Sequence, residues 1–123
     1  MTAYRVEIIA VGTELLLGNV ANTDAQFLSE MLASVGVDVL YHTAVGDNPA
    51  RLREVVDIAR GRANLLVFTG GLGPTYDDMT KQIVCEAFGL GLEFHPEIVE
   101  EIRHYFDTVF RREMPACNLQ QAY

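Results

Sequence analysis

Two kinds of segment alternate along the chain. Short segments are mostly apolar, and longer segments repeat their apolar residues with helical spacing. The short segments predict three strands, over Val6–Val11, Asp38–Val45 and Leu65–Phe68. The third is apolar throughout, as expected for a strand covered on both faces. The longer segments predict helices over Asn22–Val35, from Asn48-Pro49 onward, from about Asp78 to Phe88 and from about Pro96 to Arg111. The tail, Met114–Tyr123, has no clear pattern.

Signals at the helix ends support these assignments. Asn22 or Thr23 can cap the first helix and Gly36 ends it, and Asn48 followed by Pro49 is a typical helix start. Two core-facing stripes are expected, Ala25, Leu28, Leu32 and Val35 on the first helix and Leu52, Val55, Val56 and Ala59 on the second. On the last helix the apolar positions are Ile98, Ile102, Tyr105, Phe106 and Val109.

Strands that alternate with helices predict an α/β layered fold with a mainly parallel sheet. Such sheets bind ligands at the carboxyl ends of their strands. Three predicted loops therefore share one edge of the sheet: Gly12–Thr23, Gly46–Asn48 and Thr69–Thr80.

Composition narrows the class of protein. The chain has 123 residues, half of them apolar, which suits one domain and excludes a disordered chain. No apolar run approaches the ~18 residues of a membrane span, and the start lacks a signal-peptide pattern, so we expect a cytoplasmic protein that binds no membrane. A net charge of −8 argues against nucleic-acid binding but leaves small phosphate ligands open. Cys85 and Cys117 lack the spacing of a zinc site, and a disulfide is not expected in the cytosol.

The strongest chemical signal is the glycine-rich segment Thr69–Lys81. Gly70, Gly71 and Gly73 free the backbone to approach a ligand, and a helix start follows, which together suit an anion. The segment has neither the P-loop nor the dinucleotide-binding pattern. A tight turn without a ligand explains the glycines equally well.

Acidic residues surround this loop. Asp77 and Asp78 repel each other unless a cation or polar partners intervene, so they suit a divalent ion, although one of them can simply cap the helix. Asp47 follows the second strand and Glu14 follows the first. Without a ligand, Asp47 would be a turn-forming residue and Glu14 a solvated acid in a loop. Lys81, the single lysine, suits a phosphate contact or a solvated helix position.

Other reaction chemistries find no support. His42, His95 and His104 have no metal-binding spacing, and no motif indicates a covalent nucleophile. Leu15–Leu17 is expected to pack or to form an oligomer contact.

Four segments resemble the N-terminal domain of the CinA family (competence/damage-inducible protein A), within the molybdopterin-binding superfamily: Ile9–Gly18, Asn22-Thr23, Ala44–Asn48 and Thr69–Thr80. The combination of GTELLLG with TGGLGPTxDDxT carries the resemblance. It implies a three-layer α/β/α molybdopterin-binding-like fold with a mainly parallel sheet. It also implies that residues 1–123 form one domain that is incomplete at its C-terminus and lacks the family's deamidase domain.

The resemblance further implies metal-dependent hydrolysis of ADP-ribose or a similar nucleoside diphosphate sugar. Asp47 and Asp78 would be catalytic, and Asp77 and Asp78 would hold magnesium or cobalt. The implied ligand-binding residues are Gly12, Thr13, Glu14, Asn22, Thr23, Thr69, Gly70, Gly71, Leu72, Gly73, Pro74, Thr80 and Lys81.

Two positions depart from the enzymes of molybdenum-cofactor synthesis, which carry Thr and Arg where this chain has Leu72 and Asp77. The exchange of a guanidinium for a carboxylate favours a metal-bridged diphosphate over direct pterin-phosphate binding. Two alternatives stay open: a molybdopterin-binding or adenylyl-transfer domain, and a non-catalytic ligand-sensing and oligomerisation domain. The expected partners are a nucleotide or pterin phosphate and further copies of the chain.

Overall fold

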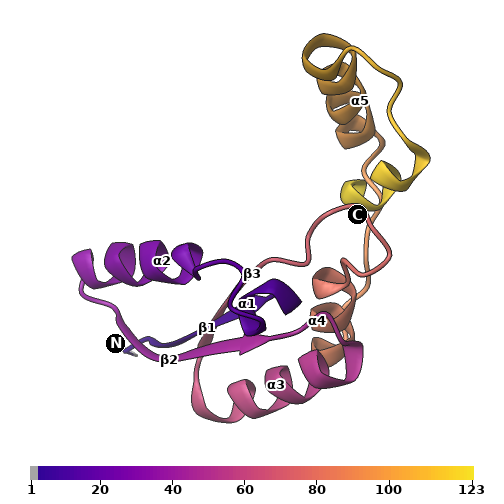
Figure 1. The fold of residues 1–123 in the computed structure, drawn as a ribbon. Helices are drawn as coiled ribbons and strands as arrows, with labels where there is room; N and C mark the ends of the chain where they lie inside the picture. Colours follow the sequence, from indigo (N-terminus) through magenta and orange to yellow (C-terminus); the bar gives the residue numbers. More distant parts are fainter. Residues whose placement is uncertain (1–2) are drawn as a thin grey trace.

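The computed structural model describes residues 3–123, which form a three-stranded parallel sheet with helices on both faces (Figure 1). The strands are β1 (Arg5–Val11), β2 (Asp38–Val45) and β3 (Leu65–Thr69), in the order β2-β1-β3. Both pairings of the central strand β1 are parallel. The predicted α/β fold with a parallel sheet is confirmed.

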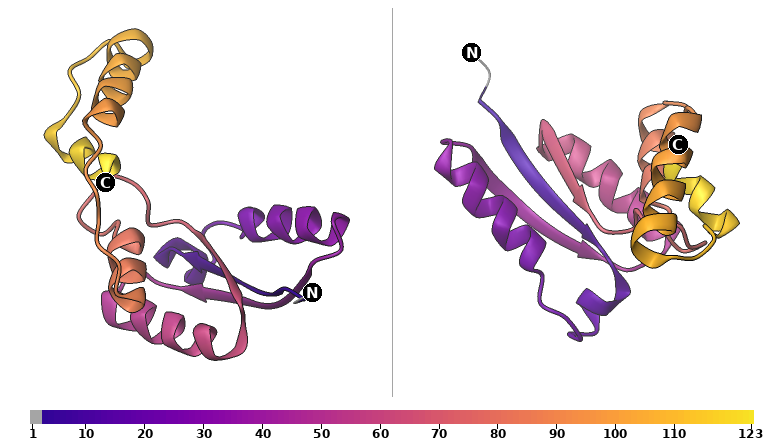
Figure 2. Two further views of the ribbon diagram at one scale, coloured as in Figure 1. Left: turned by 180° about the vertical axis from the view of Figure 1, so that it is seen from behind. Right: turned by 90° about the horizontal axis from the view of Figure 1, so that it is seen from above.

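Side chains on the two faces of β1 pack in two separate hydrophobic cores. Val6 and Ile8 pack on one face with Ala25 of α2 (Thr23–Ser34). Ile9 and Val11 pack on the other face with α3 (Pro49–Arg62) and α4 (Thr80–Phe88). Figure 2 shows α2 on the opposite side of the sheet from α3 and α4. A strand covered on both faces explains the near-continuous apolar sequence of β1.

Within β1, Glu7 is a carboxylate with no exposed surface. Arg62 at the end of α3 donates to both of its oxygens, at 2.7 and 3.1 Å, and the Thr43 hydroxyl of β2 donates at 2.8 Å. The guanidinium of Arg62 also lies 3.8 Å from the ring centre of Tyr41. The hydrogen bond to Glu7 raises the pKa of Arg62. This cluster joins β1, β2 and α3 through one buried charge that is fully hydrogen-bonded.

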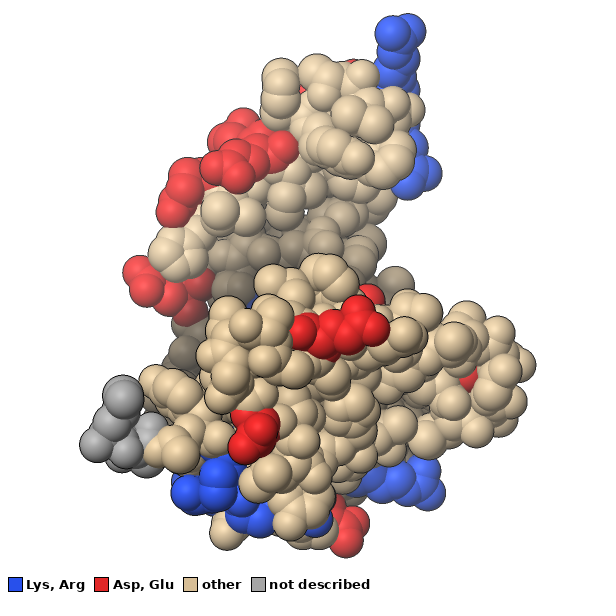
Figure 3. Space-filling view, turned by 90° about the vertical axis from the view of Figure 1, so that its left-hand side faces the viewer, with Lys and Arg blue, Asp and Glu red and all other residues tan. Residues whose placement is uncertain are grey.

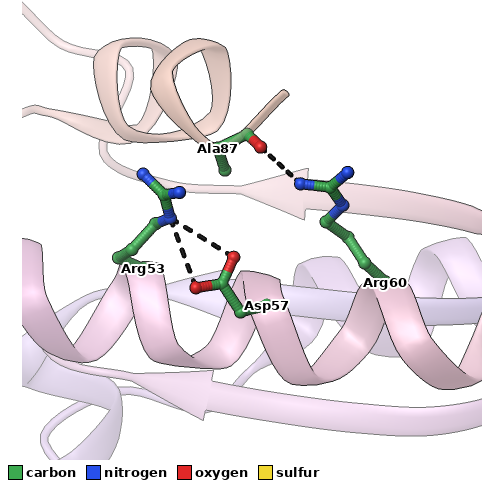
Figure 4. Close-up of polar contacts among 4 residues, drawn as sticks. All are labelled: Arg53, Asp57, Arg60 and Ala87. Carbon is green, nitrogen blue, oxygen red and sulfur yellow. Dashed lines mark hydrogen bonds and ion pairs between the residues drawn. The ribbon is translucent and has the colours of Figure 1, made fainter. Parts of the chain in front are cut away.

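Polar contacts also fasten α4 onto α3 (Figure 4). Arg60 of α3 donates to the carbonyl oxygen of Ala87 near the end of α4, and its guanidinium lies 4.4 Å from the centre of the Phe88 ring. Two turns earlier in α3, Arg53 donates to both carboxylate oxygens of Asp57 at 3.3 Å. The contacts of Arg60 matter for the site, because α4 anchors the far end of the glycine-rich loop.

The predicted helix caps are confirmed, with one choice resolved. The side chain of Asn22 accepts a hydrogen bond from the Ala25 N–H at 3.3 Å, so Asn22 is the cap and Thr23 is the first helical residue. Asn48 accepts from the Arg51 N–H at 3.0 Å, before Pro49. The prediction of Val35 on the buried stripe of α2 is wrong, because Val35 is 72% exposed. The helix ends one residue earlier, at Ser34.

Several element ends differ from the prediction. Helix α4 begins at Thr80 instead of Asp78. The last helix, α5 (Pro96–Tyr105), continues as a π-helical turn, η1 (Phe106–Phe110), and buries Val99, which was not predicted, with Phe106. Two further short helices were not predicted: α1 (Thr13–Leu16) and the 3₁₀ helix η2 (Ala116–Ala122) in the tail.

Strand β3 is less covered than its apolar sequence predicted. Its five residues are all half-buried, because only β1 pairs with it among the residues that the structure describes. Leu66 and Phe68 pack beside one core, whereas Leu65 and Val67 pack beside the other. A groove of about 480 Å³ runs along its open side and includes Val84.

The segment formed by α5, η1 and η2 projects beyond the carboxyl ends of the strands (Figures 1 and 2). The space-filling view shows a concave face between this segment and the α/β body (Figure 3). Acidic side chains gather along one flank of the segment and basic ones at its far end (Figure 3). None of the helices formed by residues 3–123 has the length and apolar content to span a membrane.

Candidate functional site

The three predicted loops meet at one edge of the sheet. The parallel register sets Val11 beside Val45 and Ala10 beside Thr69, so all three strands end together. The Gly12 N–H donates to the Val45 carbonyl oxygen at 2.8 Å and joins the first two loops. The sequence prediction of a shared loop edge is confirmed.

Asp47 fastens the first two loops to each other. Its carboxylate accepts from the Thr13 N–H at 3.2 Å, and its own N–H donates to the Thr13 hydroxyl at 3.1 Å. Thr13 is the first residue of α1, so Asp47 satisfies a free N–H at that helix start. This contact gives Asp47 a structural task at the site edge, and its catalytic role stays a prediction.

Gly12 and Glu14 form a second contact at this edge. A side-chain carbon on Gly12 would lie 2.5 Å from Glu14 Oε1, so the carboxylate of Glu14 folds back over the glycine. The start of α2, at Asn22 and Thr23, also follows this loop, and the side-chain oxygen of Asn22 is used on the Ala25 N–H. Ligand binding by Gly12, Glu14, Asn22 and Thr23 stays a prediction.

The glycine-rich loop packs directly on the end of β1. Gly70 and Gly71 have φ values of +82° and +66°, and a Cβ on Gly70 would lie 2.1 Å from the Val11 carbonyl oxygen. A Cβ on Gly71 would lie 2.0 Å from the hydroxyl of Thr80. That buried hydroxyl donates to the Gly70 carbonyl oxygen at 2.9 Å. Close packing therefore accounts for both glycines, and the role of Thr69–Gly73 in holding a phosphate stays a prediction.

Beyond the glycines, two carboxylates converge on one hydroxyl. Thr75 Oγ1 lies 2.5 Å from both Asp77 Oδ1 and Asp78 Oδ2, and the Thr75 N–H also donates to Asp78 at 3.0 Å. The hydrogen bond from the Thr75 hydroxyl holds the pKa of Asp78 below its ordinary value, and backbone N–H groups of Thr75 and Gly73 add to the effect against partial burial. Because Asp78 closes the loop in this way, it does not cap α4.

This carboxylate pair fits a hard divalent ion. Magnesium binds through one or two carboxylates together with water and ligand phosphates. Because the Thr75 hydroxyl lies between Asp77 Oδ1 and Asp78 Oδ2, an ion would bind the other carboxylate oxygens or take the place of that hydroxyl contact. No group of three or more His, Cys, Asp or Glu side chains suited to a metal occurs within residues 3–123. Asp47 therefore does not join Asp77 and Asp78 as a third ligand.

Lys81 contacts the tail. Its ammonium group donates to the carbonyl oxygens of Gln120 and Tyr123, both at 2.8 Å, so two of its three N–H bonds hold η2 against α4. The sequence left Lys81 open between a phosphate contact and a solvated helix position, and the tail had no predicted role. Because the tail lacks apolar periodicity, no sequence signal revealed that η2 lies beside the loop.

A cavity of about 310 Å³ separates the loop from η2. Its walls include Thr75, Tyr76 and Asp78 from the loop, Gln82 from α4 and Gln120 from η2. Asp78 thus lines a partly enclosed space, whereas Asp77 beside it is exposed.

Comparison with known proteins gives consistent matches. The family model described as "Probable molybdopterin binding domain" matches residues 7–117. A Bacillus velezensis protein described as "Putative competence-damage inducible protein" is 52% identical over 120 residues, which are 98% of this chain and 29% of that protein. A Streptococcus gordonii protein with the same description is 56% identical over 102 residues, 83% of this chain and 24% of that protein. The chain spans less than a third of the length of these relatives.

Solved structures match over nearly the whole chain. CinA from Thermoplasma acidophilum, described as of unknown function, has a TM-score of 0.83 at 28% identity, with 98% of this chain and 69% of that chain covered. The molybdopterin biosynthesis enzyme MoaB from Thermus thermophilus has a TM-score of 0.64 at 25% identity, with 96% of this chain and 71% of that chain covered.

Proposed function

The chain belongs to the family of molybdopterin-binding domains, and from this membership we propose that it binds the phosphate-bearing end of a nucleotide or pterin at the carboxyl edge of its sheet. The convergence of Asp77 and Asp78 beside the glycine-rich loop supports this placement best. Loops at the carboxyl ends of parallel strands are the usual ligand sites of α/β folds.

We further propose that the domain hydrolyses ADP-ribose or a similar nucleoside diphosphate sugar. Water would add to one phosphorus of the diphosphate, and the bridging P–O bond would break to give AMP and ribose 5-phosphate. Asp77 and Asp78 would hold a magnesium or cobalt ion, which supplies Lewis acidity and an ionised water when bound. The hydrogen bonds from Thr75 orient the Asp78 carboxylate and lower its pKa further below neutral.

The test compares the full chain with its Asp78→Asn variant in an ADP-ribose assay with magnesium or cobalt. The variant keeps an oxygen that accepts from Thr75 but loses the charge, so turnover should fall on the order of 100-fold. Asp107→Asn, an exposed acid in η1, is the matched control and should leave turnover unchanged. Equal turnover of Asp78→Asn and the unchanged protein would remove Asp78 from the mechanism.

A second candidate is a molybdopterin-binding or adenylyl-transfer domain. The description of the matching family and the similarity to MoaB favour it. Calorimetry with molybdopterin and with ADP-ribose separates the candidates, because tight pterin binding without turnover of ADP-ribose selects the second. Saturable nucleotide binding without metal-dependent turnover would instead select a ligand-sensing domain.

We also propose that the chain forms homo-oligomers. Large apolar side chains on and beside α1 and α2 are exposed, among them Leu17, Phe27 and Val35. Exposed apolar surface of this kind marks interaction sites when it is contiguous.

A further inference from the structure

The cavity between the glycine-rich loop and η2 has two walls. The first is the loop itself, and the second is formed by η2, which the proposed phosphate site does not use. Figures 1 and 2 agree that η2, at the C-terminal end of the chain, lies next to the loop that follows β3. The cavity volume of about 310 Å³ is at the lower end of the range for small-molecule pockets. Asp78 lines the same cavity, so the residues of η2 and one carboxylate of the pair face one space.

This wall is held in place by several contacts. Lys81 of α4 binds two carbonyl oxygens of the η2 region. The His95 N–H donates to the Ala122 carbonyl oxygen at 2.9 Å, and the buried Asn118 side chain donates to Gln121 at 2.8 Å. The centres of the Phe94 and Tyr123 rings lie 5.1 Å apart. The wall is therefore fixed to both α4 and the start of α5, as a binding surface requires.

The lining of the cavity suits a heteroaromatic ring. Gln82 and Gln120 bring side-chain amides, which carry both donors and acceptors and can match the mixed edge of such a ring. Tyr76 also lines the cavity and is 97% exposed, so its ring is free to stack on a planar ligand. The lining contains no Lys or Arg among the described residues, which argues against a second phosphate at this place.

We propose that this cavity binds the heteroaromatic end of the ligand, a nucleobase or a pterin ring, and that Tyr76, Gln82 and Gln120 determine specificity for that ring. The inference rests on the proposed function, because the phosphate end of the same ligand would lie at Asp77 and Asp78. The backbone of Gln120 is held by Lys81, so its side chain can be exchanged without loss of that contact.

The experiment uses AMP and ribose 5-phosphate, which carry the same phosphate on the same sugar and differ in the base. Calorimetry of the full chain with magnesium should show that AMP binds at least about tenfold more tightly, the size of one stacked base. Tyr76→Ala and Gln82→Ala should each lower the affinity for AMP several-fold and leave that for ribose 5-phosphate unchanged. Gln26→Ala, an exposed glutamine on α2, is the matched control and should change neither.

Three results would overturn the inference, in distinguishable ways. Equal binding of AMP and ribose 5-phosphate removes the ring site and leaves the phosphate site standing. Preference for AMP that survives both variants removes the assignment to these residues. Binding of neither compound removes the proposed function and this inference with it.

If AMP binds more tightly than ribose 5-phosphate, competition of free adenine and of free pterin against AMP distinguishes the two ring types, because the ring that fits should displace AMP.

Discussion

At the scale of single residues, the distance between the glycine-rich loop and β1 is set by the hydrogen atoms that Gly70 and Gly71 carry in place of a side chain. The Val11 carbonyl oxygen and the Thr80 hydroxyl occupy the positions that side-chain carbons would take. Any larger residue would push the loop away from the sheet and displace Thr75, Asp77 and Asp78 as a group. The glycines thus act on the site through position, whether or not their N–H groups touch a ligand.

Gly70→Ala is therefore expected to lower the free energy of unfolding by about 2 kcal/mol or more. The reasons are the left-handed φ and the 2.1 Å approach of a Cβ to backbone. Chemical denaturation measures the change. Gly61→Ala is the matched control, because Gly61 lies in α3 with open space around it, and there the exchange should stabilise by roughly 0.5–1 kcal/mol. Similar effects of the two exchanges would contradict the close packing at Gly70.

At the scale of elements, the sequence predicted those parts whose cause is local. Strand β1, the caps at Asn22 and Asn48 and the stripe of α3 follow from periodicity and turn chemistry over a few residues. Helix α1 is only four residues long, and η2 has no apolar stripe. Their places depend on contacts distant in sequence, such as that of Thr13 with Asp47, which local patterns do not contain.

In the candidate site, too, some parts were predictable from local sequence and others were not. The residue types of the loop and its place at the sheet edge were predictable, because parallel strands bring their ends together. The start of α4 was placed two residues early, because an Asp before a helix usually caps it, whereas Asp78 bonds back to Thr75. The wall contributed by η2 lies about forty residues further along the chain and was missed.

The junction of α4 and η2 depends on one side chain. Lys81→Met keeps most of the length of the side chain but removes both hydrogen bonds to η2. Amide hydrogen exchange in Ala116–Ala122 should speed up by at least about tenfold, because even one hydrogen bond of a charged group contributes about 1.5–3 kcal/mol. Arg53→Met, which removes a surface cation from α3, is the control and should leave η2 protected. Unchanged exchange in η2 of the Lys81 variant would show that other contacts hold this segment.

At the scale of the whole molecule, the chain exposes more surface than its mass requires. Its accessible area is 8049 Å², against about 6,600 Å² for a compact monomer of 13.7 kDa. The projecting segment of α5, η1 and η2 accounts for part of the excess, as Figure 1 shows. Exposed apolar side chains on and beside the helices α1 and α2 add a surface that a second copy can cover.

Light scattering after size-exclusion chromatography should therefore give a mass of at least twice 13.7 kDa. Leu17→Glu and Phe27→Glu place a charge at side chains that are 68% and 60% exposed. Each should shift the mass toward the monomer without loss of helical content, because neither side chain belongs to the core. A monomeric unchanged protein at every concentration would contradict self-association through this surface.

The order β2-β1-β3 also has a consequence for how the protein is made. Of these three strands the central one, β1, is synthesised first, and its second neighbour, Leu65–Thr69, follows more than fifty residues later. Synthesis adds about 5–20 residues per second, so roughly 3–12 s pass before β3 can pair with β1 and complete the sheet. During that interval the nascent chain exposes the apolar side chains of β1 that later form both cores, and chaperones bind chains in such a state. The central position of β1 thus makes the growing chain, rather than the finished fold, the stage most vulnerable to aggregation.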